Sequence, residues 1–136
     1  MKFTFKRSVL LVAAVIAFTA AKAQIQCTTY ACFLCKWGGE SKMIIPNIFT
    51  PNNDGINDYW KPEVINELCL TDYNVMIFSK WGDLVFESNV SSLGWSGNSP
   101  DGGIPCSEGS YYYLLTYKNA YTREVSKFKG FLQLER

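Results

Sequence analysis

From Met43 to its end, the chain consists of short runs in which side-chain character alternates, and turn residues separate these runs. Alternation places successive side chains on opposite faces of a strand, whereas no stretch sustains the period of a helix. The predicted strands cover residues 73–79, 83–88, 111–117, 124–128 and 131–134. We expect Gly82 to supply a positive φ for a hairpin between the first two strands, and Gly130 to break the last run. The pattern predicts an all-β fold, an immunoglobulin-like β-sandwich of about seven short strands.

The first 23 residues have the order of a cleavable secretory signal peptide. Basic residues come first, at Lys2, Lys6 and Arg7. An apolar run follows over residues 9–21, and Ala21 and Ala23 form a small-x-small cleavage site before Gln24. The apolar run falls short of the roughly 20 residues that span a bilayer. We therefore expect cleavage after Ala23 and no transmembrane segment in the mature chain.

The mature chain has room for one modest domain. We divide it into a short cysteine-rich lead-in, residues 24–42, and a β-domain, residues 43–136. Four basic residues leave with the signal peptide, so nine of 13 remain against 12 acidic residues, and the mature net charge is −3. This balance gives no electrostatic footprint for nucleic acid or for anionic lipid.

The sequence offers no catalytic machinery that we recognise. It contains no histidine, no G-x-S-x-G elbow and no P-loop, so the commonest general base and two common signatures of acyl-transfer and nucleotide chemistry are absent. The remaining carboxylates are scattered in turns. We therefore predict that the protein is not an enzyme.

Five cysteines follow the cleavage site, in a compartment where disulfides persist: Cys27, Cys32, Cys35, Cys69 and Cys106. Cys69 and Cys106 each lie just before a predicted strand, and we predict that neighbouring strands bring them together as a disulfide. The other three cysteines would then hold an odd thiol, which could link the lead-in to other surface proteins.

The spacing of Cys32 and Cys35 is also that of a C-x-x-C redox motif. No βαβ unit accompanies it, so we favour a structural or intermolecular disulfide over redox chemistry. A tetrahedral zinc site formed by the lead-in cysteines and one more ligand is a further alternative.

Residues 52–58 pack five Asx side chains around Gly55. Asn52, Asp54 and Asp58 carry hard oxygen atoms of the kind that bind calcium, and no other cofactor is indicated. The loop is not an EF-hand, because Thr50 and Lys61 stand where acidic ligands would be required. The alternative, which we favour, is a turn stabilised by Asx side chains that cap backbone amides.

Six segments occur in the order of a known family's motifs. Residues 46–58 are similar to P-x-x-F-T-P-N-x-D-G-x-N-D, 75–82 to an I-F-N-R-W-G hairpin, 84–88 to V-F-E-S, 94–97 to G-W-D-G, 109–113 to G-x-Y-x-Y, and 129–136 to K-G-x-h-x-L-x-R. From Ile45 to Arg136 the chain thus resembles the gliding motility-associated C-terminal domain, the type B sorting domain of the type IX secretion system. The departures are Ser79 for Asn, Lys80 for Arg and Ser96 for Asp.

The resemblance implies a non-enzymatic sorting domain. After export on the signal peptide, the outer-membrane translocon of the type IX system would recognise the domain and deliver the protein to the cell surface or medium. The motif residues that it marks for sorting are Lys80, Trp81, Gly82, Trp95, Lys129, Gly130 and Arg136. The alternatives are a small secreted binding or adhesion module that acts through its cysteine-rich segment, and a remnant of a longer cargo.

Overall fold

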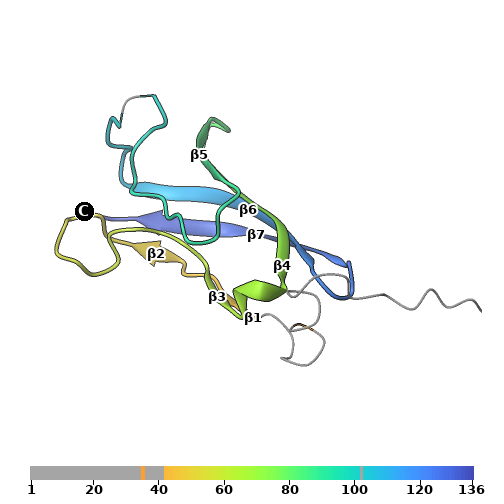
Figure 1. The fold of residues 1–136 in the computed structure, drawn as a ribbon. Helices are drawn as coiled ribbons and strands as arrows, with labels where there is room; N and C mark the ends of the chain where they lie inside the picture. Colours follow the sequence, from red (N-terminus) through yellow and green to blue (C-terminus); the bar gives the residue numbers. More distant parts are fainter. Residues whose placement is uncertain (1–34, 36–41, 102) are drawn as a thin grey trace, which may run out of the picture.

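The computed structural model describes residue 35, residues 42–101 and residues 103–136 (Figure 1). The predicted signal peptide and the cysteines at positions 27 and 32 lie outside the described residues. The described strands are β1 (Lys42–Ile44), β2 (Ile48–Phe49), β3 (Glu63–Ile65), β4 (Leu70–Phe78), β5 (Leu84–Ser88), β6 (Gly109–Asn119) and β7 (Val125–Leu134). One short 3-10 helix, η2 (Glu67–Cys69), precedes β4. The prediction of an all-β fold is confirmed.

The strands form two sheets, which fit the predicted β-sandwich. β1 and β3 pair antiparallel in the smaller sheet, and the larger sheet has the order β2-β7-β6-β4-β5. The longest ladder joins β6 and β7 without a register shift, from Gly109 opposite Leu134 to Lys118 opposite Val125 (Figure 1). β2 is the exception to the antiparallel pattern, because its two residues run parallel to the end of β7. The C-terminal strand therefore lies inside the larger sheet.

The hydrophobic core covers one face of the larger sheet. Alternation along the strands places Val75 and Ile77 of β4, Leu115 of β6, and Leu132 and Leu134 of β7 on this face, all of them buried. The other buried members of the cluster are Phe49, Trp60, Tyr73, Trp95, Tyr111 and Tyr117. Aromatic side chains thus fill much of the space above the sheet.

Trp60 and Trp95 join two irregular segments above this core. Their backbones exchange a reciprocal pair of hydrogen bonds, 2.9 Å from the Trp60 amide and 2.8 Å from the Trp95 amide. The Trp60 indole N–H donates to the carbonyl of Pro46 at 2.7 Å. Both indoles are buried, so this pair closes the core where regular strands do not reach.

The opposite face of the larger sheet carries a second set of apolar side chains. The registers of β4, β6 and β7 place Met76, Phe78, Tyr112, Leu114 and Phe131 on this face. Tyr112 and Phe131 form an edge-to-face pair with ring centroids 5.5 Å apart. This side of the sheet is therefore polar only in part.

The predicted break at Gly130 is wrong. β7 continues through Gly130, which lies opposite Tyr113 of β6. A Cβ atom at Gly130 would lie 2.7 Å from the Tyr113 hydroxyl oxygen. Glycine is needed there because the tyrosine ring covers the strand, and the backbone does not bend away.

Candidate functional site

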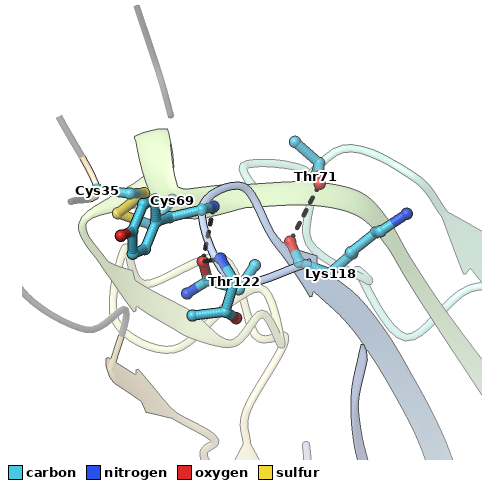
Figure 2. The surroundings of a disulfide bond; sticks show 7 residues. Cys35, Cys69, Thr71, Lys118 and Thr122 are labelled. Carbon is cyan, nitrogen blue, oxygen red and sulfur yellow. Dashed lines mark hydrogen bonds between the residues drawn. A yellow bond between two sulfur atoms is a disulfide. The ribbon is translucent and has the colours of Figure 1, made fainter. Parts of the chain in front are cut away.

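A disulfide joins Cys35 to Cys69, with 5.1 Å between the Cα atoms (Figure 2). Both cysteines are buried, together with Ala120 of the turn between β6 and β7. The Ala120 amide donates to the Cys69 carbonyl at 3.0 Å. The bond therefore holds Cys35 at the end of the larger sheet where β4 begins and β6 ends. In the chain-entropy model, a disulfide that closes a loop as long as the one between Cys35 and Cys69 stabilises the folded state by about 4 kcal/mol.

The predicted pairing of Cys69 with Cys106 is wrong. β4 and β6 are antiparallel, and Leu70 at the start of β4 lies opposite Asn119 at the end of β6. Cys106 precedes the start of β6, and a strand of this length separates it from Cys69 by about 30 Å. Two cysteines that each precede a strand lie near one another in a parallel pair, but at opposite ends of an antiparallel pair.

Cys106 keeps a free thiol. Burial raises the pKa of this thiol, while the charge of Arg136 acts in the opposite direction. Cys35 is bonded to Cys69, so it is not available as a link to other proteins. The prediction that Cys35 could form such a link is therefore wrong. The remaining two cysteines, at positions 27 and 32, lie outside the described residues.

The Asx-rich loop uses its side chains to hold its own backbone. Asp58 accepts the amides of Asn53 and Gly55 on its two carboxylate oxygens, at 2.6 and 2.9 Å. Asp54 accepts the Ile56 amide at 2.7 Å and the Asn52 side-chain amide at 2.9 Å. The hydrogen bond from Ile56, followed by that from Asn52, holds the pKa of Asp54 below its ordinary value. These contacts are those of the Asx-stabilised turn.

We expect calcium to leave the melting midpoint of the mature protein unchanged. All four carboxylate oxygens of Asp54 and Asp58 already accept N–H donors, and within the described residues no group of three or more His, Cys, Asp or Glu side chains is placed to hold a metal ion. Thermal melting with added calcium and with a chelator checks this, and Asp58→Asn serves as the control variant. A higher midpoint in calcium that this variant abolishes would establish the metal site at Asn52, Asp54 and Asp58 instead.

Trp81 stands at the tip of the hairpin between β4 and β5, and 81% of its surface is exposed. Ser79 builds the turn: its hydroxyl oxygen accepts the Trp81 amide at 3.1 Å, and its hydroxyl donates to the Asp83 carboxylate at 3.2 Å. Gly82 has a φ of 91°, which favours glycine. The Lys80 ammonium lies 5.2 Å from the centre of the indole ring. A rigid turn thus presents a large aromatic side chain to solvent.

A cavity of ≈ 690 Å³ lies between this hairpin and the segment before β6. Trp81 and Ile104 are apolar side chains of its lining and are both largely exposed. Its charged lining consists of Lys80, Asp83, Asp101 and Glu108. Three carboxylates against one ammonium make the cavity acidic, which suits a partner with a basic side chain.

Arg136 braces the far wall of the cavity. Its guanidinium donates to the carbonyls of Cys106 at 2.6 Å and Gly97 at 3.0 Å, and its backbone amide donates to the Glu108 carboxylate at 3.0 Å. The end of the chain therefore holds the segment that faces Trp81.

The structure divides the predicted sorting residues into two groups. Gly82, Trp95, Gly130 and Arg136 serve the fold: the Trp95 indole, for example, is buried and donates to the Asn98 carbonyl at 2.8 Å. Lys80, Trp81 and Lys129 are exposed. Lys129 lies on β7 and not beside the hairpin, so the motif residues do not form one surface.

Trp60 is the structural residue that the sequence analysis missed. It is fully buried and paired with Trp95, although it follows a loop of polar residues. A tryptophan directly after a turn was the available signal, because large aromatic side chains contribute much of a small core.

Comparisons with known proteins identify the family of the chain. Within the described residues, no helix is long and apolar enough to cross a membrane. A search of curated proteins gave no significant match. The family model of the CHU_C type IX secretion signal domain matches residues 43–134, which include every strand of the larger sheet and the Trp81 hairpin. Such a signal domain implies export to the cell surface or medium. The chain therefore belongs to the CHU_C type IX secretion signal domain family.

Proposed function

We propose that the folded unit from Met43 to Arg136 is the signal for type IX secretion, and that the outer-membrane translocon binds it at the Trp81 hairpin. The exposure of the Trp81 side chain is the main observation that supports this proposal. The hydrogen bonds of Ser79 hold the backbone of the turn that carries Trp81, and tryptophan is enriched among the residues that dominate protein interfaces. The adjoining acidic cavity supplies a place for a basic side chain of the partner.

The proposed role is non-enzymatic. Secretion signal domains are recognised by an export machine, and the Trp81 surface offers an aromatic side chain and charged groups for such recognition. Of the lead-in cysteines assigned to an adhesion module, Cys35 is already bonded to Cys69. No observation favours that second function.

The test is an export assay with a matched pair of variants. Residues 43–136 are fused behind a signal peptide and a fluorescent reporter, and reporter fluorescence is measured in periplasm, at the surface and in the medium of a host with a working type IX system. We expect the parent fusion to reach the surface or medium, and Trp81→Ala to hold at least about 90% of the reporter in the periplasm, since loss of one hot-spot side chain costs on the order of 2 kcal/mol.

Tyr59→Ala is the control, because Tyr59 is also a largely exposed aromatic residue but does not line the cavity beside Trp81. This variant should be exported like the parent, and both variants should melt within a few degrees of it. A parent reporter that stays in the periplasm would overturn the sorting role itself. Normal export of Trp81→Ala would overturn the assignment of the binding surface.

A further inference from the structure

The outer edge of β7 is mostly unpaired within the described part of the chain. β7 runs from Val125 to Leu134, but β2 pairs only with Gln133 and Leu134 on this side. The ladder stops at Pro46, which has no N–H to donate and whose carbonyl accepts the Trp60 indole. Among the described residues, no strand therefore pairs with residues 125–131 of β7 on the side away from β6.

The backbone groups that face this edge can be identified. The amides of Gln133 and Glu135 donate outward, to the carbonyls of Asn47 and Phe49. N–H and C=O groups of alternate residues in a strand point to the same side, and the register with β6 does not shift. The amides and carbonyls of Lys127, Lys129 and Phe131 therefore also point outward, where a further strand would bond to them.

The side chains along this edge define what it would accept. Lys127 and Lys129 are exposed on the same face of the sheet, and neither takes part in an ion pair among the described residues. Phe131 follows them on that face and is 72% exposed. Lysine on an edge strand commonly prevents pairing with the wrong partner. Residues 43–136 contain 11 acidic side chains against seven basic ones, so the two neighbouring lysines form a local basic patch on an acidic domain.

A second copy of the chain is a poor match for this edge. Antiparallel pairing of two β7 edges about Lys127 and Lys129 places lysine opposite lysine, and like charges directly opposite one another are destabilising. Opposite charges at these positions are stabilising. Pairing between two copies of this edge is therefore disfavoured, and pairing with an acidic strand is favoured.

We propose that the β7 edge, residues 125–131, is a β-strand-addition site for an extended acidic segment of a partner protein. The segment would alternate, with carboxylates opposite Lys127 and Lys129 and an apolar side chain opposite Phe131. The site lies at the opposite edge of the larger sheet from β5 and the Trp81 hairpin, and it does not depend on the sorting role of that hairpin.

The first test measures amide exchange by NMR in the mature full-length chain, with synthetic peptides as probes. One peptide alternates threonine with glutamate, its counterpart alternates threonine with lysine, and a third is the acidic peptide with a central proline. We expect the acidic peptide to slow amide exchange at Lys127, Lys129 and Phe131 by at least about tenfold, because their exposed backbone amides become hydrogen-bonded to the peptide. The amides of Phe128 and Gly130, which face β6, should not change, nor should any amide with the other two peptides.

The second test reverses the charge of the two lysine positions on the β7 edge. The double variant Lys127→Glu, Lys129→Glu should lose protection by the acidic peptide and gain protection by the lysine peptide. Lys129→Pro removes one outward amide without removing a bond to β6, so it should bind neither peptide, whereas Lys129→Thr keeps the amide and should keep part of the binding. If the proline variant fails to fold, the charge exchange still decides the matter.

Three results would overturn the proposal. The acidic peptide could leave the three outward amides unprotected, the charge exchange could leave peptide preference unchanged, or the outward amides could become protected with rising protein concentration alone. The last result would assign the edge to a second copy of the chain.

Discussion

Deletion of residues 129–136 should leave no folded protein, and the truncated chain should be found only in the periplasm or be degraded there. β7 pairs with β6 over ten residues, and the deletion removes six residues of this ladder together with the buried Leu132 and Leu134. Loss of one buried leucine side chain alone costs about 2–5 kcal/mol, and a small domain is stable by only about 5–15 kcal/mol. Circular dichroism of the purified mature chain and fractionation of cells measure the two effects.

Glu135→Ala is the control for this deletion. Glu135 is exposed near the end of the chain, and its substitution should change neither the melting midpoint nor export. Appearance of the truncated chain in the medium would show that the terminal strand is dispensable and would contradict its place inside the sheet.

Ile77→Asp should prevent folding as completely, although it leaves every terminal residue in place. Ile77 is fully buried on β4, between Phe86 of β5 and Tyr113 of β6. An aspartate there would be desolvated without a partner, which costs several kcal/mol. We therefore expect this variant to be unfolded in urea-free buffer and trapped in the periplasm.

Ile77→Val provides the matched comparison. It removes one methylene from the same site, so we expect a loss of about 1 kcal/mol in urea unfolding and unchanged export. Together the two substitutions separate a folded signal from a linear one. If Ile77→Asp reaches the medium while unfolded, the terminal sequence alone is the signal.

Alternation of side chains was sufficient to locate β4, β5 and β6 of the larger sheet. Residues 73–79, 83–88 and 111–117 fall within or close to β4, β5 and β6, and in β4 and β6 alternate side chains are buried in the core. The short strands β1, β2 and β3 were not located individually, since two or three residues are too few to show a period.

The errors come from contacts that depend on the fold as a whole. Gly130 resembles a strand break in the sequence, yet it makes room for a ring from the neighbouring strand. The partner of Cys69 depends on strand direction, which alternation alone does not define. Trp81 and Arg136 were recognised as motif residues, but only the structure shows that one is exposed and the other supports the opposite wall of the cavity.

The Cys35–Cys69 bond also distinguishes the two ends of the larger sheet. It places Cys35 beside the turn between β6 and β7, at the start of β4, whereas Trp81 follows the far end of the same strand. The terminal residue Arg136 also lies at that far end, against the segment before β6. Cys35, to which any upstream polypeptide is joined, therefore lies at one end of the larger sheet, and the Trp81 surface lies at the other end.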